Sequence, residues 1–184
     1  MSTRTKSLLV AAVVLLIVVS GATGWLLRGN GDITNAAAKS DVPVGVPTIV
    51  SQGELSEMAR HHYPFYAAGN RPGTKMEVTV TKKSAVFVRY LPDDVDAGDK
   101  GEYLTVSTYQ AIDGYDALKG ADKDAADVTE SKNGAIIAVF KERPLSTYFS
   151  FKNAGFQVEV FSPKSGESKK LTDGGDIKLV GGGS

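Results

Sequence analysis

The amino-acid sequence predicts an α+β protein: a single N-terminal transmembrane helix, then a mostly antiparallel β-sheet domain packed on one side by about two helices. Three observations support this fold class. Residues 7–27 form a mainly apolar run of 21 residues without a charge. Strand-like runs follow one another at 75–91 and 134–162 with only short turns between them, which is typical of antiparallel hairpins. Two further segments, 51–62 and 113–123, begin with residues that cap helices.

The segment 7–27 carries no charged side chain and would form a helix of about 30 Å, the thickness of the hydrocarbon core of a bilayer. Arg4 and Lys6 precede it, and Trp25 lies at its far end, where an indole ring suits the membrane interface. We therefore expect a single-pass protein of the cell membrane, with residues 1–6 as a cytoplasmic tail.

A cleaved signal peptide is the alternative interpretation of the same residues. Its charged region would be residues 1–6, its apolar region residues 8–19 and its small-residue cleavage site residues 20–22, which would leave a secreted domain. Against cleavage, the apolar character resumes over residues 25–27. Both interpretations place the folded domain outside the cytoplasm.

Composition divides the remaining chain into three parts. Residues 28–46 mix Gly, Asn, Ala and Pro without apolar periodicity, which is typical of a flexible tether. Residues 47–180 are expected to form the extracytoplasmic α+β domain. The Gly-Gly-Gly-Ser at 181–184 resembles a linker remnant and is left out of the predicted fold.

The first helix of the domain is predicted over residues 51–62. Ser51 and Glu54 match a capping box, in which each side chain binds the main-chain amide of the other residue. The residues that follow place an apolar stripe on one helical face, formed by Leu55, Met58, Ala59 and His62. A second helix is expected to start at Asp113 and to run to about residue 123.

The first strand of the domain is predicted over residues 75–82, where apolar and polar side chains alternate. Met76, Val78 and Val80 share one face and polar residues share the other, which predicts a strand with one solvated face. Further strands are predicted at 84–91, 103–109, 134–142, 146–152 and 156–162, with a last short strand at 177–180.

The charge and cysteine content narrow the classes of partner. Residues 1–39 hold four of the 21 basic and one of the 21 acidic residues, so residues 40–184 hold 17 and 20, a net charge of −3. Nucleic-acid binding needs a concentrated cationic surface, so no nucleic-acid partner is expected. The chain has no cysteine, which removes disulfides, thiolate metal sites and a cysteine nucleophile.

The common catalytic motifs are absent from the sequence. The two histidines, His61 and His62, are adjacent, so on a helix they point about 100° apart and cannot chelate one metal together. No HExxH, GxSxG, GxGxxG or GxxxxGK pattern occurs. The sequence therefore indicates no catalytic residue and no cofactor, and it favours a non-enzymatic role.

The densest group of carboxylates is a candidate metal site formed by Asp94, Asp96 and Asp99. Oxygen-rich loops attract calcium, and the spacing of the first two aspartates matches the start of an EF-hand loop. The match then fails, because Gly98 falls one place early and Thr105 occupies the position of the bidentate glutamate. A solvated acidic loop is the alternative interpretation.

Arg89, Tyr90 and Tyr66 are candidate ligand-binding residues. Arg89 interrupts an otherwise apolar strand, where a charge must reach water or find a carboxylate. The expected carboxylates are those of residues 93–99 or Glu159. A structural ion pair is the alternative role for Arg89, and core packing is the alternative role for the two tyrosines.

Five segments carry a resemblance to a known group of proteins: Pro-Phe-Tyr-Ala-Ala-Gly at 64–69, Val-Arg-Tyr-Leu-Pro at 88–92, Gly-Asp at 98–99, Leu-Thr-Val-Ser-Thr-Tyr at 104–109 and Gln-Val-Glu-Val-Phe at 157–161. Residues 47–163 resemble a family of small, uncharacterised, membrane-anchored proteins of actinobacteria. The resemblance implies a bacterial envelope setting and assigns a role to no residue.

These observations lead to one main hypothesis and two alternatives. The main hypothesis is a binding or interaction module with a protein partner at the cell envelope, held to the membrane by residues 7–27. One alternative is an envelope hydrolase or transferase that uses a carboxylate of residues 93–99 and a distant glutamate. The other is a subunit of a membrane complex, in which the small residues 21–24 allow close helix contact.

The membrane segment predicts the outcome of cell fractionation. The intact chain should sediment with membranes and remain in the pellet after a wash with alkaline carbonate, because residues 7–27 are too long and too apolar to stay in water. Recovery of the chain in the supernatant, with residues 1–30 still attached, would contradict the prediction.

Overall fold

The computed structural model describes residues 42–61 and 64–181. These residues form a mostly antiparallel sheet with three helices, which confirms the α+β class, although about two helices had been expected. The predicted transmembrane helix, the cytoplasmic tail and most of the tether lie outside the described residues. Within residues 42–61 and 64–181, no helix has the length and apolar character needed to span a membrane.

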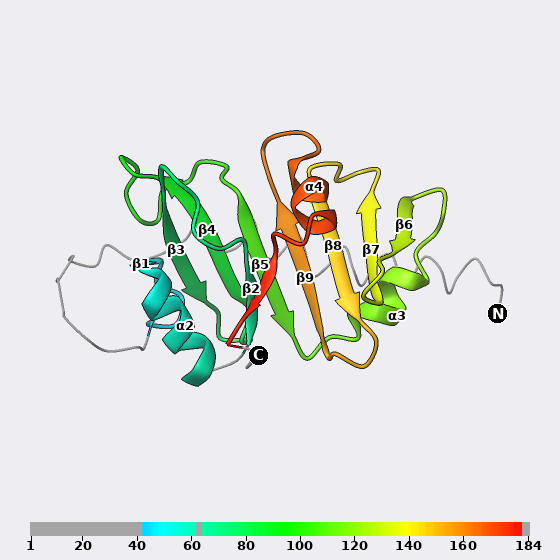
Figure 1. Ribbon diagram of the computed structural model, residues 1–184, viewed down its shortest axis with the longest axis horizontal. Helices are drawn as coiled ribbons and strands as arrows, with labels where there is room; N and C mark the ends of the chain where they lie inside the picture. The colour runs from blue at the N-terminus through cyan, green and yellow to red at the C-terminus, as the bar shows by residue number, and fades with distance from the viewer. Residues whose placement is uncertain (1–41, 62–63, 182–184) are drawn as a thin grey trace.

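The main sheet has eight strands, all paired antiparallel. Their spatial order is β1 (Thr48–Val50), β3 (Thr74–Val80), β4 (Val86–Pro92), β5 (Thr105–Gln110), β9 (Phe156–Phe161), β8 (Ser146–Phe151), β7 (Ala135–Phe140) and β6 (Ala126–Glu130). The strands β3 to β5 and the strands β6 to β9 each form a meander. Pairing of β5 with β9 joins the two meanders at the centre of the sheet (Figure 1).

One face of the sheet is apolar and covered. The covering elements are α2 (Gln52–His61), α4 (Glu167–Asp173) and a two-stranded sheet of β2 (Phe65–Ala67) and β10 (Lys178–Val180) (Figure 1). They bury Met76 and Val78 of β3 together with apolar side chains of β4, β5, β8 and β9. Most of the apolar burial that stabilises the fold is on this face.

The opposite face is covered only in part. The short helix α3 (Gly114–Lys119) packs over β7 and β8 through Tyr115 and Leu118. At the other end, residues 93–103 fold over β3 and β4, where the Gly98 amide donates to the Glu77 carboxylate. Glu77 and Thr79 on this face are 1% and 4% exposed. The prediction that this face of β3 is solvated is therefore wrong. The prediction that helices pack on one side only is also wrong, because α3 lies on the second face.

The strands predicted at 75–82, 84–91, 103–109, 134–142, 146–152 and 156–162 are confirmed, with ends displaced by one or two residues. Three short strands were missed, namely β1, β2 and β6, and the tail contains the helix α4 before β10. The helix that begins at Asp113 ends at Lys119 rather than near residue 123, because the Gly120 amide closes it by donating to the carbonyl groups of Asp116 and Leu118.

The capping box at the start of α2 is confirmed. The Ser51 amide donates to Glu54 Oε2 over 2.7 Å, and the Glu54 amide donates to Ser51 Oγ over 3.3 Å. The hydrogen bond from the Ser51 amide holds the pKa of the Glu54 carboxyl below its ordinary value. Leu55, Met58 and Ala59 of this helix are buried, as the apolar stripe predicts.

Replacing Ser51→Ala should lower the free energy of unfolding by about 1 kcal/mol, because the helix loses its N-terminal hydrogen-bond acceptor. The matched control is Ser56→Ala, in the middle of the same helix, where the change should stay within about 0.5 kcal/mol. Denaturant titration followed by circular dichroism measures both values. Equal losses in the two variants would show that the cap contributes nothing.

Candidate functional site

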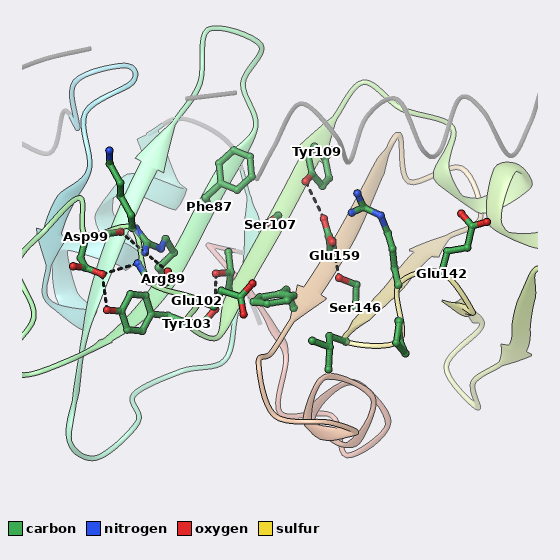
Figure 2. A pocket seen from close by; sticks show the side chains of 17 residues that line it. Phe87, Arg89, Asp99, Glu102, Tyr103, Ser107, Tyr109, Glu142, Ser146 and Glu159 are labelled. Carbon is green, nitrogen blue, oxygen red and sulfur yellow. Dashed lines mark hydrogen bonds between the residues drawn. The ribbon is translucent and has the colours of Figure 1, made fainter. Parts of the chain in front are cut away.

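The open middle of the second face is hollowed into a cavity of about 500 Å³. Its floor consists of side chains from β4, β5 and β9. One wall is the segment 99–103, and the other is the turn 142–146 between β7 and β8. Figure 2 shows these two walls on either side of Phe87 and Ser107. We call this cavity the central groove.

A buried ion pair holds the first wall of the central groove in place. Glu77 and Arg89 lie directly opposite each other in the register of β3 and β4, and Arg89 Nη1 donates to Glu77 Oε1 over 2.8 Å. Arg89 Nη2 donates to the carbonyl oxygens of Asp99 and Gly101, and the second Glu77 oxygen accepts from the Gly98 amide. The pair thus fastens residues 98–101 to the sheet.

The rim of this wall is a hydrogen-bonded pair formed by Tyr103 and Asp99 (Figure 2). The Tyr103 hydroxyl donates to Asp99 Oδ1 over 2.6 Å, and the Gly101 amide donates to the same oxygen. The Tyr103 hydroxyl is the main cause that lowers the pKa of Asp99, and the same bond raises the pKa of Tyr103. The Arg89 guanidinium lies 5.2 Å from the centroid of the Tyr103 ring, within the range of a cation–π contact.

The floor of the central groove is built around the carboxylate of Glu159 on β9. Its Oε1 accepts hydrogen bonds from the hydroxyls of Ser146 and Tyr148 at 2.8 and 2.9 Å, and its Oε2 accepts one from Tyr109 at 3.0 Å. The donors come from β5 and β8, the two neighbours of β9. Glu159 is 7% exposed, and Figure 2 shows it between Tyr109 and Ser146.

Burial raises the pKa of both Tyr109 and Tyr148 well above 10.0, the ordinary value of tyrosine, and the neighbouring charge of Glu159 raises it further. A hydrogen bond with Ser107 lowers the pKa of Tyr109, and one with Arg143 lowers the pKa of Tyr148, but each effect is smaller than that of burial. Both phenols therefore keep their protons at physiological pH and remain hydrogen-bond donors to the carboxylate.

Acidic side chains outnumber basic ones around the central groove. The basic side chains are Arg89, Lys100 and Arg143, and the acidic ones are Asp99, Glu102, Glu142 and Glu159. Of these carboxylates, only that of Glu159 is buried. Among the residues that the structure describes, no basic side chain lies within 4.0 Å of its oxygens. Within the described residues, the groups that donate directly to this carboxylate are three neutral hydroxyls.

The structure separates the three residues predicted to bind a ligand. Arg89 faces the central groove, whereas Tyr90, its neighbour on β4, points to the helix-covered face. The Tyr90 hydroxyl accepts from the Ala68 amide over 2.7 Å, and burial raises its pKa to about 12. Tyr66 is also buried on that face, edge-on to Phe149 at a centroid distance of 5.1 Å.

The predicted partner of Arg89 also needs correction. The carboxylates proposed for it were those of residues 93–99 and Glu159, but the ion pair is made with Glu77. In the loop, the main-chain oxygens of Asp99 and Gly101 accept hydrogen bonds from the guanidinium, whose charge also contributes to lowering the pKa of Asp99. Glu77 was missed because its place in an alternating strand assigned it to solvent.

The three aspartates predicted to bind a metal lie in the loop after β4. Asp94 and Asp96 are exposed, and Asp99 is bound to Tyr103 and to the Gly101 amide. Within residues 42–61 and 64–181, no group of three or more histidine or acidic side chains is placed to hold a metal ion.

The sequence reasoning missed the residues at the floor of the central groove: Ser107, Tyr109, Ser146, Tyr148 and Glu159 as a group. The available signal was the glutamate in the strand Phe-Gln-Val-Glu-Val-Phe at 156–161, which like Arg89 places a charge in an apolar strand at the centre of the sheet. The hydrogen-bond partners of Glu159 lie on β5 and β8, and only the register of these strands with β9 brings them to it.

Comparison of the chain with protein-family models, with curated proteins and with solved structures finds no match.

Replacing Arg89→Met should lower the free energy of unfolding by about 3–5 kcal/mol, because Glu77 would be left as a buried charge without its cation. The double variant Glu77→Gln with Arg89→Met should recover part of this loss, since it removes the uncompensated charge. Denaturant unfolding of both variants, with Lys83→Met on an exposed turn as the control, measures the effect. Equal stability of the single and double variants would contradict the role of the pair.

Proposed function

We propose that this protein is a membrane-anchored binding module at the cell envelope, and that the central groove binds a small organic ligand. The anchor in this proposal is the apolar segment 7–27, with the folded domain on the outer side of the membrane. The main support is the groove itself, whose volume of about 500 Å³ is within the usual range for small-molecule sites.

The make-up of the groove supports binding. Phe87, Tyr109 and Phe161 provide aromatic surface, while Ser107 and Glu159 provide polar groups at the floor. Ligand sites commonly combine an apolar lining with a few fixed polar groups that set the orientation of the ligand. The strands β4, β5 and β9 that carry these groups belong to the centre of the sheet, and a site built on strands holds its groups more precisely than a site on loops.

The alternative of a hydrolase or transferase has one observation in its favour, which is the presence of Glu102, Glu142 and Asp99 around the same groove as Glu159. The hydrogen bonds weigh against it. Asp99 is bound by Tyr103 and Gly101, and both oxygens of Glu159 already accept from hydroxyls. A carboxylate held in this way suits recognition better than attack on a substrate, because a nucleophile needs an unhindered oxygen.

A single cysteine tests whether the groove is open, because the natural chain has none. Thr105 is partly exposed and lines the groove, so a small methanethiosulfonate reagent should label the variant Thr105→Cys within minutes in the full-length protein in detergent. The control is Thr147→Cys on the helix-covered face, which is 0% exposed and should label only on unfolding. Equal labelling rates would contradict an open groove.

The same variant tests binding. Benzylamine, benzoate and glucose represent a cationic, an anionic and a neutral hydroxylated ligand. At least one of them should slow the labelling of Thr105→Cys in a concentration-dependent manner, since a ligand at the floor covers the thiol. Failure of all three to slow the reaction would contradict the proposed binding function.

A further inference from the structure

We infer that the ligand of the central groove carries a positively charged nitrogen, which Glu159 binds as its counter-ion. This inference rests on the proposed binding function and specifies the chemistry of the ligand.

The hydrogen-bond capacity of Glu159 exceeds the number of its donors. A carboxylate offers about four acceptor positions, and the hydroxyls of Ser146, Tyr148 and Tyr109 fill three of them. Two of these bonds go to Oε1 and one to Oε2, so one acceptor position remains on Oε2. Glu159 lines the groove, and a ligand there can donate to this oxygen.

The charge of Glu159 also favours a cationic ligand. A buried carboxylate is stabilised far more by a cation than by neutral donors. Within the described part of the chain, Glu159 has three neutral donors and no ion pair. An ammonium group of a ligand would complete this site. A ligand carboxylate would instead bring a second negative charge to a floor that holds one already.

Aromatic side chains line the groove together with the carboxylate. Phe87 and Tyr109 both line the groove, and their rings meet edge to face at a centroid distance of 5.9 Å. Aromatic rings attract cations through their negative faces. A carboxylate next to aromatic side chains is thus a suitable receptor for an ammonium group that carries carbon substituents.

The positive charge of Arg143 weakens the attraction of the groove for a cationic ligand. It lines the groove and interacts with the Tyr148 hydroxyl, which in turn donates to Glu159. Its guanidinium therefore opposes the entry of a second cation into the same hydrogen-bond network. Removal of this charge should strengthen the binding of an ammonium ligand, whereas removal of the Glu159 charge should weaken it.

The experiment compares benzylamine with benzyl alcohol, which has a similar shape and no charge, by protection of Thr105→Cys in the full-length chain. Benzylamine should protect at a concentration about ten-fold lower than benzyl alcohol, because a charge-assisted hydrogen bond exceeds a neutral one by about 1.4 kcal/mol. Adding Glu159→Gln should abolish this difference, and adding Arg143→Met should increase it.

The matched control is Glu130→Gln on the exposed edge strand β6, which removes one negative charge away from the groove and should leave the ten-fold preference unchanged. Near-ultraviolet circular dichroism establishes that each variant is folded. Should Glu159→Gln fail to fold, the comparison of benzylamine with benzyl alcohol in the variant Thr105→Cys, which retains Glu159, tests the preference for a cation.

The outcomes separate the two proposals. Equal protection by benzylamine and benzyl alcohol, or protection by benzoate or glucose without benzylamine, would overturn the cationic ligand while the binding function stands. An ammonium preference that survives Glu159→Gln would also overturn it. Failure of every probe to protect the thiol would contradict the binding function and the inference together.

Discussion

The buried ion pair between Glu77 and Arg89 is the constraint on which the shape of the second face depends. Two charges at opposed positions of β3 and β4 are costly to bury unless their remaining polar atoms also find partners. The main chain of residues 98–101 supplies these partners. The loop after β4 is therefore held over the sheet, where it contacts Glu77 and forms one wall of the central groove.

The central groove lies between the loop after β4 and the helix α3, which cover the two ends of this face and leave its middle open. The loop covers β3 and β4 at one end, and α3 covers β7 and β8 at the other through an apolar cluster around Leu118 and Ile136. Between them, β5 and β9 present Ser107 and Glu159, which an apolar element could not cover without leaving polar groups unpaired. The polarity of the central strands and the openness of this face thus have one cause.

Much of the fold follows from local sequence, whereas the site does not. Alternation located β3, and Ser51 with Glu54 located the start of α2, because both signals depend on near neighbours. Alternation cannot show what covers the polar face of a strand, so Glu77 was assigned to solvent although residues about twenty positions later bury it. Glu159 was missed as a centre because its donors lie on other strands, and their approach depends on the order of the sheet.

The two buried glutamates of this face show how a structural carboxylate differs from one suited to recognition. Glu77 has a cation on one oxygen and a main-chain amide on the other, and its side chain is fully enclosed. Glu159 accepts hydrogen bonds from three neutral hydroxyls and, within the described residues, makes no ion pair; it retains 7% exposure and borders a cavity. If Glu77 and Glu159 both served the fold alone, each would be expected to have a cationic partner within the chain, because a buried charge without one destabilises a protein. A carboxylate at the floor of an open groove, whose direct hydrogen-bond donors within the described residues are all neutral, is explained when its cation comes from outside the chain.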